Sequence, residues 1–303
     1  MKYSKTNKPL YCPQTTSTWY KGAVTNSKPV GILWHDTAAG NSTLKRYVQP
    51  SDDAADKDYW LKLLGKNKYA NDWNHIDRQA GLNCWIRKLA DGTVSTVQTG
   101  PWTSIPWGCG NGSKGSCNGY ITNNGKKIYN GQHWIQFEIC DDGYKDKAYF
   151  EAVYKEAVEI TAYLCKEFDI DPTGVVNYNG VQVPTILCHA DSYKLNLGSN
   201  HGDIYSWFTA MGLPKNMNNV RNDVKKLLEE SNIKETISMS NSKLATYTNL
   251  TPNCTKPRNH AIDTLTPHVV VGQVTAPWIA DYFMNPSLEA SCNYGIGKDG
   301  DIS

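Results

Sequence analysis

The sequence lacks any long apolar run, and this absence excludes two classes of protein. No stretch of the 303 residues approaches the length of a membrane-spanning helix. The N-terminal segment, residues 1–10, carries basic residues but no apolar core of the kind that a signal peptide needs. We therefore expect a chain that has no membrane partner and that is synthesised in the cytoplasm without a signal peptide.

A large excess of one charge is also missing. Lys and Arg total 31 and Asp and Glu total 29, so the formal net charge is only +2. This balance argues against nucleic acid as the main partner and favours a neutral or weakly charged substrate. The nine cysteines lack the dense spacing of a small disulfide-rich scaffold, which indicates synthesis in a reducing compartment.

Two short apolar runs, at residues 30–35 and 184–189, each end in a histidine. Both are expected as buried strands, which would deliver two imidazoles to one edge of a sheet. His201 and Asp203 follow the second run, and either could supply a third ligand. Three protein ligands leave one position of a zinc ion open, as in catalytic zinc sites. The sequence therefore predicts a zinc hydrolase.

Further periodic segments set the expected fold. Residues 83–97 predict two strands joined at Asp91-Gly92, a dipeptide typical of hairpin turns. Apolar positions recur at three and four residues over 148–168, which predicts an amphipathic helix, and a last helix is expected over 217–230. Strands that carry side chains to one edge, interleaved with long helices, predict an α/β (α+β) fold with a central mixed β-sheet flanked by helices.

A carboxylate lies on another predicted strand. Apolar and polar residues alternate over 133–140, so Glu138 shares a face with Trp134 and Gln136. On that face Glu138 is either solvated or catalytic. His75 and His133 do not fall in such motifs, and we expect structural or surface roles for them.

The domain organisation follows from a change of composition. Residues 231–246 are polar and rich in Ser and Asn without a clear period, which predicts a linker after a catalytic domain at 1–230. The remaining segment, 247–303, is predicted to be a truncated or degenerate second copy of the first domain.

Two features of the tail support the repeat. Residues 262–268 are expected as a strand that ends in a histidine, and Asn293–Ser303 matches Asn83–Ser95 once a two-residue gap is allowed. The sequence ends within this pattern, before the positions that would correspond to Glu138, His189 and Asp203. We therefore expect that it cannot hold a three-ligand metal site by itself.

Cysteines near the predicted site offer other chemistry. Cys109 and Cys117 bracket a Gly- and Ser-rich loop and could form a disulfide, although we expect reduced thiols there. Cys188 precedes His189, but neighbours on a strand point to opposite faces and do not readily form a nucleophile and base pair.

Four motifs occur in order along the chain: Trp34–Ser42, Phe137–Asp142, Cys188–Asp191 and Ser199–Asp203. Together they resemble those of the N-acetylmuramoyl-L-alanine amidases of the type-2, peptidoglycan-recognition superfamily, and in particular clostridial phage or prophage endolysins. The resemblance covers roughly residues 3–230, and the tail from about Leu244 resembles the opening of another such domain.

The resemblance implies roles for individual residues. His35, His189 and Asp203 would bind Zn²⁺, Glu138 would act as the catalytic base and His201 would polarise the substrate. The third ligand stays open between Asp203 and His201, because the family often has a lysine where this chain has His201.

The resemblance also implies two substrate-binding residues, Asn83 and Trp107. Where many relatives carry a Trp-His-Ala-Gly segment beside the groove, this chain has Trp107-Gly-Cys-Gly. We therefore expect that one polar contact to the substrate is lost there.

The implied function is zinc-dependent hydrolysis of the amide bond between N-acetylmuramic acid and L-alanine in bacterial peptidoglycan. Peptidoglycan would be the partner, and the enzyme would act at the cell wall after release from the cell. Two alternatives stay open. One is a binding module that recognises muropeptides without cutting them, and the other is a cysteine peptidase that acts on the stem peptide.

Overall fold

The structure is a computed structural model, and it forms two compact units, Met1–Leu228 and Glu229–Ser303. No helix in its described part is both long and apolar enough to cross a membrane. The described residues are 8–41, 43–213, 215–240 (side chains as far as 231), 252, 272–288, 292, 294–296, 298–299 and 302.

A six-stranded mixed sheet forms the centre of the first unit, with the strand order β1-β4-β3-β7-β2-β10. All neighbouring strands are parallel except β3 and β4, which form the antiparallel hairpin predicted around Asp91-Gly92. The expected central mixed sheet is confirmed. Its strands are β1 (Leu10–Tyr11), β2 (Lys28–Asp36), β3 (Cys84–Lys88), β4 (Val94–Gln98), β7 (Gln132–Ile139) and β10 (Ile186–Cys188).

Two small hairpins accompany this sheet, and each is a separate two-stranded sheet. The first lies inside the long loop that follows β4, so this loop is partly regular. The hairpins are β5 (Tyr120–Asn123) with β6 (Lys126–Tyr129), and β8 (Val175–Tyr178) with β9 (Val181–Pro184).

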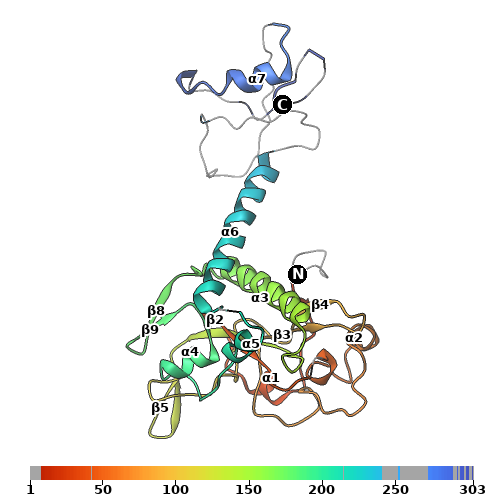
Figure 1. The fold of residues 1–303 in the computed structure, drawn as a ribbon, viewed down its shortest axis with the longest axis vertical. Helices are drawn as coiled ribbons and strands as arrows, with labels where there is room; N and C mark the ends of the chain where they lie inside the picture. Colours follow the sequence, from red (N-terminus) through yellow and green to blue (C-terminus); the bar gives the residue numbers. More distant parts are fainter. Residues whose placement is uncertain are drawn as a thin grey trace. The chain divides into compact units, whose positions relative to one another are not determined.

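The predicted long helix is present as α3, which lies across one face of the sheet (Figure 1). It begins after Asp146, whose carboxylate accepts hydrogen bonds from two N–H groups of the first turn. The helices that begin in this unit are α1 (Thr18–Gly22), η1 (Leu44–Arg46), α2 (Lys57–Leu64), α3 (Lys147–Glu167), α4 (His189–Lys194), α5 (Tyr205–Ala210) and α6 (Met217–Ser240).

Alternation along the central strands separates the two faces of the sheet. Trp34 of β2 and Phe137 of β7 lie in the apolar core with α3, and the Trp34 indole donates a hydrogen bond to the Thr161 hydroxyl of that helix. Their neighbours His35 and Glu138 are partners in the parallel register of β2 and β7. Successive side chains point to opposite faces. His35 and Glu138 therefore share the face opposite α3.

Helix α6 is longer than predicted. It runs to Ser240, so residues 231–240 of the predicted linker are helical. The segment contains no glycine or proline that would end the helix, and extending an existing helix costs far less than starting one. The predicted end of this helix at residue 230 was wrong, and residues 241–246 of the predicted linker lie outside the described residues.

The second unit is described only in part. It contains α7 (Ala276–Tyr282), the short helix η2 (Pro286–Leu288) and an antiparallel bridge between Ile296 and Ile302. The predicted strand at 262–268 lies outside the described residues.

Candidate metal centre

Two neighbouring strands bring the predicted histidines to one edge of the sheet. His35 lies near the C-terminal end of β2, and His189 begins α4 directly after β10. The two strands are parallel, with Cys188 opposite Trp34 in the register, so their carboxyl ends coincide. The loop before α5 supplies Asp203. One ligand atom from each of His35, His189 and Asp203 lies within 4.8 Å of the others, and all three residues are buried.

Both imidazoles turn the same ring nitrogen toward the carboxylate. The Nδ1 atom of His35 lies 3.1 Å from Oδ2 of Asp203, and Nδ1 of His189 lies 3.6 Å from Oδ1. The two rings meet edge to face with centroids 4.8 Å apart. The site is therefore a compact set of two nitrogens and a carboxylate around one point.

The other nitrogen of each ring faces an oxygen atom. Nε2 of His35 lies 3.0 Å from the side-chain Oε1 of Gln136, and Nε2 of His189 lies 3.1 Å from the backbone oxygen of Cys109. A carbonyl oxygen only accepts hydrogen bonds, so each Nε2 carries the proton and each neutral ring keeps its lone pair on Nδ1. Two lone pairs and a carboxylate then converge, and a shared cation or proton is needed to stabilise them. Neutral imidazoles and a carboxylate are ligands that zinc takes, so the residues fit this metal.

The electrostatics of Asp203 agree with a charged ligand. Burial by itself raises the pKa of this carboxyl, but His189 and His35, when their rings carry a proton on Nδ1, hold the pKa well below its usual range through hydrogen bonds and positive charge. Its backbone oxygen also accepts a hydrogen bond from the Ala190 N–H, which ties the loop to the start of α4. Asp203 is therefore ionised at neutral pH.

His201 lies beside this set and not within it. Its ring stacks on that of His189, with centroids 4.4 Å apart and planes 14° from parallel. Its side chain is 59% exposed, and its Nδ1 atom lies 3.8 Å from Oδ1 of Asp203. The residue between His35 and His189 is thus Asp203, while His201 borders the centre on the solvent side.

The pKa of Glu138 is shifted in the opposite direction from that of Asp203. Its Oε2 atom is buried and has no hydrogen-bond partner among the described residues. Burial, followed by the negative charges of Asp203, Asp36 and Asp141, raises the pKa of Glu138 well above its usual range. The carboxyl therefore keeps its proton while these charges are uncompensated, and a cation nearby would favour its ionised form.

The two predicted substrate-binding residues differ in access. Asn83 is fully buried, its amide donates to the backbone oxygens of Pro101 and Ser104, and its Oδ1 accepts from the Gln136 N–H. These contacts give Asn83 a structural role and do not support the substrate-binding prediction. Trp107 is only half-buried, so it stays a candidate.

The residues expected to be structural do make structural contacts. His75 pairs with Asp72 at 2.8 Å, and His133 is buried between the Ser27 hydroxyl and the Trp102 backbone oxygen. Every cysteine in the described part of the chain has a free thiol, and all of these except Cys292 are buried.

Sequence reasoning missed the supports of the two histidines. Gln136 was placed on the face of Glu138, but its contact with His35 was not predicted. The backbone oxygen of Cys109 and the Ser199 hydroxyl, 3.2 Å from Nε2 of His189, were also missed. The alternation over 133–140 could have indicated Gln136, whereas backbone contacts of a loop leave no signal in the sequence.

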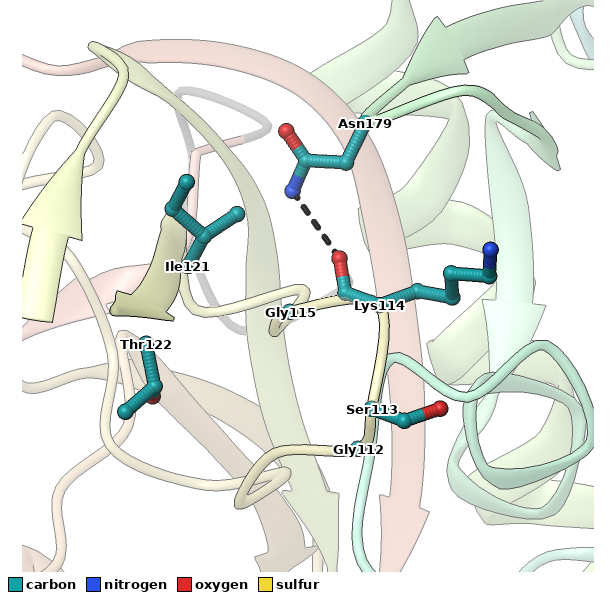
Figure 2. A pocket seen from close by; sticks show the side chains of 7 residues that line it. All are labelled: Gly112, Ser113, Lys114, Gly115, Ile121, Thr122 and Asn179. Carbon is teal, nitrogen blue, oxygen red and sulfur yellow. Dashed lines mark hydrogen bonds between the residues drawn. The ribbon is translucent and has the colours of Figure 1, made fainter. Parts of the chain in front are cut away.

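A pocket of about 400 Å³ lies outside this centre, where Asn179 donates a hydrogen bond to the Lys114 backbone oxygen (Figure 2). None of the three clustered residues lines it. Its lining residues are Gly112, Ser113, Lys114, Gly115, Ile121, Thr122 and Asn179.

Comparison with known proteins gives the family. A search of curated proteins found no match. Among solved structures, the chain resembles the Staphylococcus aureus hydrolase AmiA in complex with its ligand, at 18% identity and a TM-score of 0.39, over 73% of this chain and 78% of that one. It also resembles PlyL, at 12% identity and a TM-score of 0.39, over 72% and 96%. The PlyG catalytic domain matches at 13% identity and a TM-score of 0.38, over 72% and 94%.

These structural likenesses are distant, but the family model is specific. The model described as N-acetylmuramoyl-L-alanine amidase matches residues 25–203, which is more than half of the 303-residue chain. The match includes His35, His189, Glu138 and Asp203. The chain therefore belongs to the type-2 N-acetylmuramoyl-L-alanine amidase family, as its motifs predicted.

Proposed function

We propose that the chain is a zinc-dependent amidase that hydrolyses the bond between N-acetylmuramic acid and L-alanine in bacterial peptidoglycan. The observation that carries this proposal is the convergence of the His35 and His189 Nδ1 atoms on the Asp203 carboxylate, in a member of this family. Peptidoglycan is then the partner, and the bacterial cell wall is the place of action.

His35, His189 and Asp203 would hold the zinc ion. A zinc ion in such a set lowers the pKa of a bound water to about 7 and polarises a carbonyl group. The ionised carboxylate of Asp203 and the neutral tautomers of the two rings are already the forms that metal binding needs, because ligands must be deprotonated. Metal binding therefore requires little free energy for changing the protonation of the three ligands.

Glu138 is the proton carrier in this proposal. It takes a proton from the attacking water and gives it to the alanine nitrogen as the carbon–nitrogen bond breaks. The new carbon–oxygen bond leaves a lactyl carboxyl group on the glycan and a stem peptide with a free N-terminal alanine. A raised pKa suits both halves of this task, since the group must first accept the proton and then release it.

His201 and Trp107 would contact the substrate. The exposed His201 imidazole can donate a hydrogen bond to the carbonyl oxygen as it becomes negative, which is the role that the family resemblance assigns to it. Trp107 is half-buried and adjoins Gly108, which lies against Gln136 and close to His35. Its ring offers an apolar face at the border of the site.

The thiol alternative has less support. Cys188 is fully buried, and burial raises the pKa of its thiol to about 12. A thiolate is the nucleophile in cysteine peptidases, so a thiol with this acidity is a poor candidate. Cys109 is also fully buried, which denies a substrate access to its sulfur.

The domain organisation remains part of the proposal. We infer a catalytic domain at 1–230, a connection at 231–246 that begins as helix, and a partial second copy at 247–303. An antiparallel bridge joins Ile296 and Ile302 within the segment that aligns with the first hairpin.

The test uses the purified full chain and bacterial cell walls. Zinc is measured by metal analysis, and free N-terminal alanine is measured before chelation, after chelation and after zinc return. We expect one zinc per chain, with alanine release that chelation abolishes and zinc restores. Wall binding without zinc or alanine release would instead favour the binding module, and release that is blocked by thiol alkylation but unaffected by chelators would favour the cysteine peptidase.

A further inference from the structure

The contact between His35 and Gln136 raises a question about proton placement. Gln136 is fully buried on β7, and its Oε1 atom lies 3.0 Å from Nε2 of His35. An amide can present either its oxygen or its nitrogen to a ring, and the two choices require opposite tautomers of the histidine. The orientation of the Gln136 amide therefore decides which nitrogen of His35 is free.

Asn118 fixes this orientation. Gln136 Nε2 donates to Asn118 Oδ1 at 2.7 Å, and the same oxygen accepts the Cys109 thiol at 3.1 Å and the Cys109 N–H at 3.4 Å. The Asn118 amide nitrogen donates to the backbone oxygen of Gly110 at 3.4 Å. A backbone N–H only donates and a backbone oxygen only accepts, so neither amide can be reversed without losing these bonds. Gln136 must then present its oxygen to His35.

Cys109 also determines the tautomer of the second histidine, His189. The backbone oxygen of Cys109 accepts the hydrogen bond from Nε2 of His189 at 3.1 Å. The two backbone groups of Cys109 thus act on both rings, one directly and one through Asn118 and Gln136. Gly108 allows this close approach, because a Cβ atom at that position would lie only 2.3 Å from Gln136 Oε1.

A competing tautomer makes this support necessary. The Asp203 carboxylate lies 3.1 Å from Nδ1 of His35 and attracts a proton to that nitrogen. A proton there would block the atom that faces the metal position. The Gln136 oxygen opposes this by holding the proton on Nε2.

We propose that Gln136 is a positioning residue for the metal, which together with Asn118 and the Cys109 backbone keeps Nδ1 of His35 free to bind zinc. The inference rests on the zinc site of the proposed function. Hydrogen bonds of this kind around metal ligands typically change metal affinity by about 10- to 100-fold when they are removed.

The test compares Gln136→Met with Gln49→Met in the full chain. Gln49 is also a buried amide with backbone partners, but its contacts are to Val48, Gly65 and Asn67, so it is a matched control for the loss of a buried amide. Zinc affinity is measured by competition with a chelating dye. We expect Gln136→Met to weaken binding by about 10- to 100-fold, and Gln49→Met to leave it unchanged.

A second variant and a second readout keep the proposal falsifiable if Gln136→Met does not fold. Asn118→Ala keeps Gln136 but removes the anchor of its amide, together with the Asn118 hydrogen bonds to Cys109 and Gly110, and we expect a smaller loss of zinc affinity in the same direction. Long-range ¹H–¹⁵N NMR of the metal-free protein should find the His35 proton on Nε2 in the wild type and partly on Nδ1 in a folded variant.

The outcomes separate this inference from the function itself. A wild-type chain that binds no zinc would overturn the proposed function. A wild-type chain that binds zinc, with unchanged affinity and tautomer in both the Gln136 and the Asn118 variants, would overturn the role of Gln136 alone.

Discussion

A buried histidine lies at each end of the parallel strands β2 and β7, and the two histidines differ in the group that faces their Nδ1 atom. At the start of β7, Nε2 of His133 lies 3.0 Å from the Trp102 backbone oxygen and Nδ1 lies 2.9 Å from the Ser27 hydroxyl. At the end of β2, Nε2 of His35 also faces a carbonyl oxygen, but Nδ1 faces the Asp203 carboxylate. A hydroxyl can donate to a lone pair and a carboxylate cannot. The partner of the second nitrogen thus separates a structural histidine from a metal ligand.

Buried acidic residues also distinguish the end of the sheet with His35 from the end with His133. Asp36, Glu138 and Asp203 gather at the end with His35, and burial together with the negative charges of Asp203 and Asp141 raises the pKa of Asp36 to about 7. At the other end, burial lowers the pKa of His133 to about 4, and the ring is neutral. One end of the sheet therefore concentrates acidic groups whose ionised forms a cation would stabilise, while the other end holds a neutral imidazole.

The largest expected effect comes from removing the proton carrier at the charged end. Glu138→Gln keeps the shape of the neutral carboxyl, so we expect the fold and zinc content to be retained. Release of free N-terminal alanine should fall by about 10²- to 10⁴-fold, the usual contribution of a general base. Glu151→Gln changes an exposed carboxyl on α3 and serves as the matched control. Full activity of Glu138→Gln would remove this residue from the mechanism.

A smaller effect is expected at the uncharged end, and it concerns stability. The pKa of His133 is lowered from 6.5 to about 4, so its contribution to stability is complete above pH 6.5 and is lost as the pH falls toward 4. Each pH unit below 6.5 costs about 1.4 kcal/mol. Between pH 7 and pH 5, the metal-free wild type should lose about 2 kcal/mol more unfolding free energy than His133→Gln, as measured in urea. Equal losses in the two proteins would contradict a buried neutral His133.

Much of this arrangement could be predicted from the sequence. The apolar runs that end in histidines, the Asp91-Gly92 turn and the three- and four-residue spacing of α3 are local patterns, and local patterns determine these elements. The placement of His35 and His189 at one edge follows from two neighbouring parallel strands. The family motifs added Glu138 and the choice between Asp203 and His201.

The remaining features depend on contacts between distant segments. Alternation along β7 gives the face of Gln136 but not its register with β2, so its contact with His35 could not be predicted. The irregular loop that carries His201 and Asp203 has no period, which left the third ligand open. Asn83 begins a predicted strand, and the neighbouring residues did not indicate that its side-chain amide would form hydrogen bonds with three backbone groups.

The central claim is that Asp203, and not His201, completes a zinc site with His35 and His189. Zinc stoichiometry of the purified wild type, Asp203→Asn, His201→Ala and His133→Gln tests it most directly. The account predicts one zinc in all but Asp203→Asn, with alanine release by His201→Ala reduced by about 10²- to 10³-fold. Retention of zinc by Asp203→Asn together with its loss from His201→Ala would contradict the account and make His201 the third ligand.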